Sequence, residues 1–320
     1  MLRLFKRQDI NDELWNQTIY QSCNGVIYAL AHFLDQTIHK WEAIIDFNEN
    51  DSNPYKIIMP LIIGKKYGLR YMAHEPFLTE LGIFSKQVLV QEKVAEIINA
   101  ARNLTVKVNN YPFENSLSQL VSASLDRIYL KEAQLNQLSL NMPYEQLLKG
   151  YNRNRSRILK RAGDLPLIVA ETNDIETHVR LFEAFTYPKI KGMESYQLNQ
   201  LKKIYYAMAS HGLAKIYDVR YENITLSSGI FLFFNKVITY YTCTNSALGK
   251  KYDSQSILLD FIIRKYSNSP HILEAYSGSH SGVDYFYRSF NFSKKNLYIW
   301  NDQKIKMLKS ALSILNPIKN

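Results

Sequence analysis

The chain has 320 residues, of which 46% are hydrophobic and 21% are charged. This length exceeds what one hydrophobic core comfortably serves, and the composition excludes an intrinsically disordered chain, so we expect two globular domains. The 39 basic and 29 acidic residues leave a net charge of +10, which favours anionic partners such as nucleotide phosphates, anionic glycans or RNA. Lysines solvated on surface helices explain the charge equally well.

The two cysteines, Cys23 and Cys243, are too few for a disulfide framework and indicate a reducing compartment. The opening fifteen residues are basic but lack an apolar signal-peptide core, and no later run approaches the roughly 18 apolar residues of a membrane-spanning helix. We therefore expect a cytoplasmic protein without integral membrane association.

Hydrophobic periodicity in the first half predicts strands interrupted by two helices. The expected elements are a strand over 15–20, a helix over 25–34, strands over 41–47, 55–63 and 67–73, a helix over 88–101 and a strand over 105–109. Residues 112–150 carry mixed signals, in which 125–130 and 134–140 could pair as strands.

The pattern begins again near residue 150, which predicts domains over 1–150 and 151–320. A helix over 144–149 continues, after a break at Gly150, into a helix over 152–162 that Gly163 ends. Next come a strand over 165–170, helices over 174–184 and 196–211, and a strand over 214–221. No Gly/Ser-rich or Pro-rich linker separates the halves, so we expect them to pack firmly around a cleft in which ligands bind.

The stretch from 224 to 292 has the most distinctive order of elements. Two β-branched and aromatic runs, 224–234 and 237–244, flank Asn235-Lys236, which is short enough for a two-residue hairpin turn. A polar, basic loop follows. The remaining elements are a helix over 254–265, a strand over 271–275, a helix over 281–288 and a closing segment over 289–292.

This order resembles the catalytic half of a GNAT acyltransferase. The last helix of that superfamily commonly reads Asn-x-x-Ala-x-x-Leu-Tyr-x-x-x-Gly-Phe, and His280 to Phe292, HSGVDYFYRSFNF, matches it in length with Tyr287 and Phe292 in register. The whole chain resembles the two-domain branch related to Fem-type peptidyltransferases, also through residues 41–84 and the basic segment 151–155. The resemblance implies an α/β (α+β) chain of two tandem GNAT-like domains, each a mixed, largely antiparallel sheet flanked by helices. The resemblance also implies that the first domain is a degenerate acceptor side and that the second domain is the donor side.

The resemblance also implies a place for acyl-coenzyme A as co-substrate. In GNAT enzymes the pyrophosphate binds where a loop meets a helix N-terminus, because free backbone N–H groups converge there. In this chain the loop runs from 245 to 252, and the implied cofactor-binding residues are Leu248, Gly249, Lys250, Lys251 and Tyr252. The alternative is a basic surface turn in which Asp253 caps the next helix through its side chain.

Tyr287 is the first catalytic candidate, since the matched GNAT position often donates a proton to the leaving thiolate, a role open to a phenol. We expect it to face the gap where strands of the second domain splay. Glu274 is the candidate general base, provided that burial raises its pKa. His280 is a candidate for substrate binding. Structural roles for all three are the alternatives.

Five cations fall within nine residues from Arg153 to Arg161. Arg153, Arg157 and Arg161 share one side of a helix with Lys160, and their mutual repulsion disfavours that helix unless anions compensate it. We therefore predict that Arg153, Arg157 and Arg161 bind an anionic substrate. Exposed cations paired with distant carboxylates are the alternative.

Two classes of function remain open. The first is an N-acyltransferase that moves an acyl group from acyl-coenzyme A, or an aminoacyl group from aminoacyl-tRNA, to an amine on a small molecule, glycan or peptide. The second is a noncatalytic GNAT-fold module that binds an anionic ligand or RNA. No zinc-type Cys/His spacing, Walker loop or dinucleotide glycine motif occurs, so we expect no metal and no redox cofactor.

Overall fold

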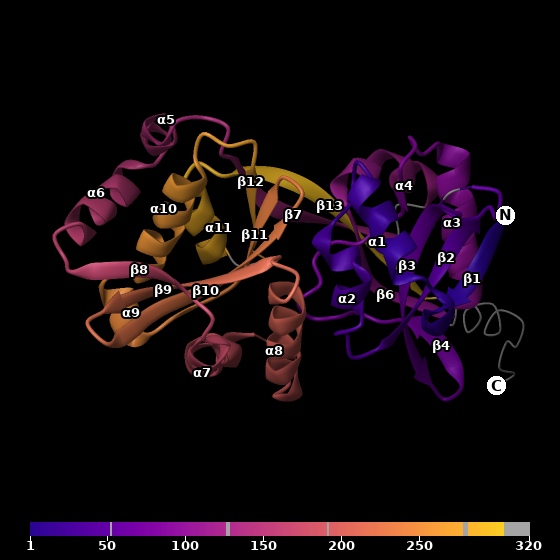
Figure 1. The fold of residues 1–320 in the computed structure, drawn as a ribbon, viewed down its shortest axis with the longest axis horizontal. Helices are drawn as coiled ribbons and strands as arrows, with labels where there is room; N and C mark the ends of the chain where they lie inside the picture. Colours follow the sequence, from indigo (N-terminus) through magenta and orange to yellow (C-terminus); the bar gives the residue numbers. More distant parts are fainter. Residues whose placement is uncertain (52, 126–128, 191, 278–280, 304–320) are drawn as a thin grey trace, which may run out of the picture. The chain divides into compact units, whose positions relative to one another are not determined.

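The computed structural model describes residues 1–51, 53–125, 129–190, 192–277 and 281–303. These residues form two compact units. The first comprises Met1–Ala133 together with the chain from Asn296 onward, and the second comprises Gln134–Lys295. Each unit is a mixed, largely antiparallel sheet flanked by helices (Figure 1), which confirms the predicted fold class.

The sheet of the first unit has the order β1-β2-β3-β4-β6-β13. All neighbours are antiparallel except β4 and β6, which are parallel, and β5 pairs with β3. The strands are β1 (Leu2–Lys6), β2 (Lys40–Phe47), β3 (Tyr55–Lys66), β4 (Leu69–Met72), β5 (Phe84–Ser85), β6 (Lys107–Phe113) and β13 (Ser293–Gln303). The helices are α1 (Asp12–Gln21), α2 (Ala31–Leu34), α3 (Gln91–Leu104) and α4 (Ser118–Ser124), with short 3-10 turns at Arg7–Asp9, Ile27–Ala29 and Asn115–Leu117.

The predicted strand over 15–20 is wrong, because these residues lie in α1. Asn11 accepts a hydrogen bond from the Leu14 amide and so caps the helix, while Asp12 and Glu13 place negative charge in its first turn. Trp15, Thr18 and Ile19 then bury one helical face. The predicted helix over 25–34 is the short turn Ile27–Ala29 followed by α2.

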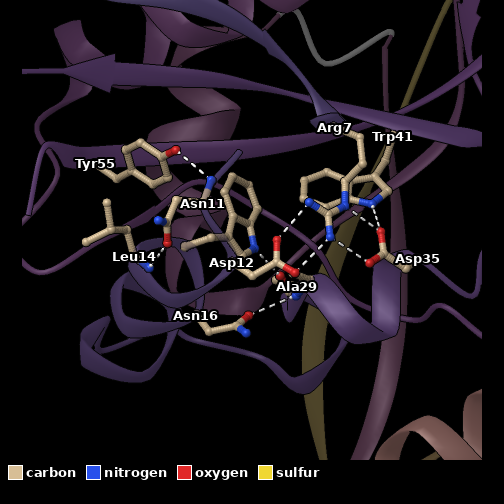
Figure 2. A network of polar contacts seen from close by, with 11 residues as sticks. Arg7, Asn11, Asp12, Leu14, Asn16, Ala29, Asp35, Trp41 and Tyr55 are labelled. Atoms are coloured by element: carbon tan, nitrogen blue, oxygen red, sulfur yellow. Dashed lines mark hydrogen bonds and ion pairs between the residues drawn. The ribbon is translucent and has the colours of Figure 1, made fainter. Parts of the chain in front are cut away.

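A polar network joins the beginning of the first unit to α2 and β2 (Figure 2). The Arg7 guanidinium donates to both Asp35 oxygens at 2.6 and 2.7 Å and also reaches Asp12, while lying 5.0 Å above the Trp41 ring. The Trp41 indole donates to Asp35 at 2.8 Å. These charge-assisted hydrogen bonds join one guanidinium to two carboxylates. They hold the segment before α1 against the loop after α2.

The sheet of the second unit has the order β7-β12-β11-β10-β9-β8, antiparallel throughout except between β11 and β12. The strands are β7 (Leu130–Ser139), β8 (Leu167–Thr172), β9 (Ala214–Tyr221), β10 (Ile224–Phe234), β11 (Val237–Asn245) and β12 (Ile272–Tyr276). The helices are α5 (Tyr144–Lys149), α6 (Arg153–Ala162), α7 (Ile175–Phe185), α8 (Tyr196–Ala209), α9 (Ala247–Lys251), α10 (Ser254–Tyr266) and α11 (Ser281–Arg288), with a 3-10 turn at Tyr187–Lys189.

The two units repeat one arrangement. In each, four antiparallel strands in chain order are followed by a strand parallel to the fourth, and an antiparallel strand completes the sheet. This repetition agrees with the tandem architecture that the order of elements predicted. It also shows that β13, which no sequence pattern predicted, occupies the sixth place in the first sheet.

The expected division at residue 150 differs from the boundaries of the compact units. Residues 134–150 belong to the second unit, because β7 pairs with β12, and the chain from Asn296 onward belongs to the first, because β13 pairs with β6. Domains over 1–150 and 151–320 therefore stay a prediction. Of the two strands expected between 125 and 140, only β7 is seen, and residues 126–128 lie outside the described ranges.

The described helices include none that is both long and apolar enough to cross a membrane. The hydrophobic core of the second unit lies between its sheet and the helices α10 and α11. It includes Tyr240, Leu258, Ile262, Leu273 and Tyr287, all of which are buried. The candidate site is built on this core.

Candidate functional site

The hairpin of β10 and β11 brings Tyr240 and Cys243 to the same face of the sheet. Its turn is Asn235-Lys236, as predicted, with Asn235 at a φ of 52°. The register shifts where Ile230 lies opposite Thr242 and Phe231 opposite Tyr240, so Tyr241 is an extra, bulged residue. The bulge reverses the alternation of side chains, and Cys243 therefore packs against the same core as Tyr240.

The strands β11 and β12 pair over only part of their length. Parallel pairing begins at Val237 and Ile272 and ends at Tyr240 and Ala275, whereas β11 continues to Asn245. In the part of the chain that the structure describes, no strand pairs with this side of β11 beyond Tyr240. Backbone N–H and C=O groups at the end of β11 that is far from the hairpin turn thus lie where an extended ligand could pair with them.

Tyr287 lies in α11 directly against this end of the pairing. Its ring centroid is 6.5 Å from that of Tyr240 and 5.4 Å from that of Phe292, and the side chain is buried. Burial raises the pKa of the Tyr287 phenol well above its usual value of 10, and the nearby Cys243 thiol adds to this effect. The phenol therefore stays protonated at neutral pH, as a proton donor must be.

Cys243 and Gln255 complete a buried polar group around Tyr287. The Gln255 amide, from the first turn of α10, donates to Cys243 Sγ at 2.8 Å. Burial raises the pKa of the Cys243 thiol to about 11, so it is neutral. No motif or periodic pattern in the sequence indicates Tyr240, Cys243 or Gln255 as site residues. Only the bulge at Tyr241 and the meeting of β11 with α10 bring them together.

Glu274 does not share the Tyr287 side of the sheet. Its neighbours in β12, Leu273 and Ala275, pack in the core with Tyr287, and side chains alternate along a strand, so Glu274 points to the opposite face. It is buried and forms an ion pair with Lys295 at 3.1 Å. The structure does not bring Glu274 and Tyr287 together, and a role of Glu274 as general base stays a prediction.

The expected pyrophosphate loop is largely helical. Residues 247–251 form α9, and its cap Ser246 accepts a hydrogen bond from the Gly249 amide at 2.9 Å. Lys250 and Lys251 are exposed. Burial and the neighbouring Lys250 lower the pKa of Lys189, so two ammonium groups lie close together beside this loop. A bound phosphate would relieve their repulsion.

The alternative, in which Asp253 caps α10 through its side chain, is wrong. Asp253 has a left-handed backbone with a φ of 53°, and its side chain makes no capping bond. Its carboxylate instead accepts from Arg161 at 2.8 Å. The negative charge that would repel a polyanion at this helix end is therefore partly neutralised by Arg161.

Gly249 is required by the packing around α9, independently of any ligand. A Cβ at this position would collide with the Leu226 carbonyl oxygen and the Asn245 side chain. We expect Gly249→Ala to lower the free energy of unfolding by about 2 kcal/mol, because overpacking forces the backbone to shift. Urea denaturation measures this loss. Gly282→Ala, in α11 with open space around its Cβ position, is the matched control and should not destabilise. Equal stability of the two variants would contradict the packing role.

The cations of α6 fall into two groups. Arg153, Arg157 and Arg161 are exposed, as a substrate-binding role requires. Arg155 is buried between the rings of Phe286 and Phe290, whose centroids lie 4.8 and 4.6 Å from its guanidinium carbon. It donates to Ser289 at 3.0 Å and to Ser256. Arg155 thus joins α6 to α10 and α11, while anion binding by the three exposed arginines stays a prediction.

His280 lies outside the described residues. Among the described side chains, no three of His, Cys, Asp and Glu are grouped as a metal ion would require.

No protein-family model matches the sequence, and no curated protein matches it. Solved structures do match. FemX superposes with a TM-score of 0.68 at 11% identity, covering 94% of this chain and 98% of its own. L-PGS from Bacillus licheniformis gives 0.55 at 10% identity, with 92% of each chain covered. A tandem GNAT protein from the clavulanic acid biosynthesis pathway gives 0.53 at 10% identity, covering 95% of this chain and 99% of its own. These likenesses confirm the predicted GNAT-like, Fem-type fold.

Proposed function

We propose that the protein is an N-acyltransferase that moves an acyl or aminoacyl group from a thioester or an aminoacyl ester to an amine. The observation that carries this proposal is the position of Tyr287 against the unpaired end of β11, beside Cys243 and Gln255. The fold supports it, since acyl transfer is chemistry that this fold hosts, although a fold alone does not fix a function.

The reaction needs one bond made and one broken. The amine nitrogen attacks the acyl carbonyl carbon, and the tetrahedral intermediate collapses with loss of the thiolate or alkoxide. The Tyr287 phenol gives its proton to that leaving atom, and the proton that the nitrogen sheds restores the phenol. No proton is gained or lost overall, and Tyr287 is the positioned acid that this step uses.

The donor binds, in this proposal, along β11. Its extended part pairs with backbone groups of β11 beyond Tyr240, where pairing with β12 has ended, and its phosphates lie near Lys189 and Lys250. Acyl-coenzyme A fits both features. An aminoacyl-tRNA supplies phosphates as well, and its alkoxide leaving group has a higher pKa than a thiolate, so it draws a proton more readily from a phenol whose own pKa is raised.

A calorimetric and thermal-shift screen separates these donors. The full chain is titrated with acetyl-coenzyme A, a long-chain acyl-coenzyme A, aminoacyl-tRNA and uncharged tRNA. We expect one acyl donor to bind more tightly than its deacylated form and to raise the melting temperature, since a ligand that binds only the folded state stabilises it.

A charge-reversal pair tests where the donor lies. Lys189→Glu with Lys250→Glu should weaken the donor that binds and flatten its salt dependence. Lys65→Glu with Lys203→Glu, at exposed lysines of β3 and α8, carries the same change of net charge and should leave binding intact. If charged and uncharged tRNA bind equally and no donor yields a transfer product, the chain is the noncatalytic module instead.

A further inference from the structure

A hollow of about 780 Å³ lies in the second unit, away from Tyr287. Its walls come from α5, α6, β8 and the outer side of α10, and Figure 1 shows α5, α6 and β8 arranged around α10. This volume falls within the range in which proteins enclose small ligands. None of Tyr240, Cys243, Gln255 and Tyr287 lines it, so its ligand is separate from the chemistry proposed above.

The walls of this hollow are mainly apolar, and the described part of the chain leaves them partly uncovered. Leu159, Leu167, Val169 and Phe261 pack on the core of the second unit but remain only partly buried, and Leu148 is exposed. Leu167 and Val169 lie two residues apart in β8, the edge strand, so their side chains are on the same face of the sheet. A contiguous apolar surface that a fold leaves uncovered marks a place where an apolar group binds.

The carboxylate inside the hollow already has its partners. Asp260 accepts hydrogen bonds from the Tyr144 hydroxyl at 2.9 Å and from the Tyr151 hydroxyl at 3.0 Å. Arg264, one turn further along α10, stacks 4.4 Å above the Tyr144 ring. Asp260 therefore does not call for a cationic ligand, because two phenols and a guanidinium satisfy it.

The ammonium groups at the hollow are not satisfied in this way. Lys149 and Lys160 line it and form no ion pair with any described residue, and Glu145 is the other carboxylate on its lining. The helix that carries Lys160 has five cations and no acid. The surrounding field is therefore positive, which attracts an anionic headgroup.

We propose that the hollow binds an amphiphile with one aliphatic chain and an anionic headgroup, the chain lying on Leu159, Leu167, Val169 and Phe261 and the headgroup at Lys149 and Lys160. The apolar wall supplies affinity by burying the chain, and the lysines select the sign of the headgroup.

Calorimetry with three amphiphiles of equal chain length tests the proposal on the full chain. Decyl phosphate, decanol and decyltrimethylammonium are titrated below the concentrations at which they form micelles, with inorganic phosphate as the chain-free probe. We expect decyl phosphate to bind tightest, decanol more weakly, and the ammonium weakest, because only the headgroup differs. Equal affinities, binding of phosphate alone as tight as that of decyl phosphate, or no binding of any amphiphile would overturn the proposal.

Two variants locate the binding. Lys160→Glu should weaken decyl phosphate about fivefold, as expected for an exposed charge, and strengthen the ammonium. Lys203→Glu, exposed in α8, is the control of equal charge and should change neither. Val169→Trp fills the hollow and should abolish binding of all three amphiphiles. Should Val169→Trp fail to fold, the contrast between Lys160→Glu and Lys203→Glu decides alone, and equal effects of those two variants would reject the site.

Discussion

Tyr287→Phe is expected to lower the turnover of acyl transfer about 10²-fold while leaving donor affinity unchanged. The reason is that a positioned general acid contributes roughly this factor, and the substitution removes only the proton donor while keeping the ring that packs on Tyr240 and Phe292. Turnover is measured with the donor that the binding screen identifies, under saturation, so that the loss appears in kcat.

The same variant distinguishes catalysis from packing. If Tyr287 is only structural, transfer stays near its original rate. The melting temperature then falls, because a buried hydrogen bond worth about 1 kcal/mol is lost. Tyr285→Phe is the matched control, since Tyr285 belongs to the same helix but is half exposed. It should leave both turnover and melting temperature unchanged.

Acid is expected to destabilise the protein through His178. This side chain of α7 is fully buried and hydrogen-bonded to the Ser228 and Thr242 hydroxyls at 2.8 and 3.1 Å. Burial lowers its pKa from the usual 6.5 to about 3, because the charged form cannot be solvated. The folded state therefore holds His178 neutral, whereas the unfolded chain binds a proton below pH 6.5.

The sign of the effect follows from this difference in pKa. The contribution of His178 to stability is fully present above pH 6.5 and is lost as the pH falls toward 3. We expect a loss of about 3 kcal/mol in the free energy of unfolding by about pH 4, at 1.36 kcal/mol per unit. Urea denaturation across this range measures it.

His178→Gln is the control, because a glutamine amide can bond both hydroxyls but does not titrate. The variant should lose the part of the acid dependence that lies between pH 6.5 and 4. If wild type and variant decline in parallel, other groups cause the acid sensitivity and the account of His178 is wrong.

Local signals predicted the central hairpin and the last helix well. The strand β10, the turn Asn235-Lys236 and the helix α11 have the predicted bounds, because alternation and helical spacing there agree with the final packing. The Trp15 region shows the opposite. Aromatic and β-branched residues suggested a strand, but the Asn11 cap and the acidic first turn stabilise a helix there.

The surroundings of Tyr287 could be predicted only in part. The tail motif indicated Tyr287 itself, since a linear pattern carries it. Its neighbours Cys243 and Gln255 depend on a bulge at Tyr241 and on the close approach of α10, and neither leaves a periodic trace in the sequence. The opposite orientation of Glu274 likewise follows from strand alternation only once β12 is placed.

The origin of β13 has a consequence for synthesis on the ribosome. The first sheet begins with Leu2, yet its sixth strand comes from Ser293–Gln303, and the bonds that join it span up to 200 residues, as between Arg102 and Asp302. The second sheet draws all its strands from residues between 130 and 276. Although domains generally fold in the order in which they emerge, the first sheet must here wait until Ser293–Gln303 has been translated. Its open edge at β6 is exposed to chaperones or to misassembly in the meantime.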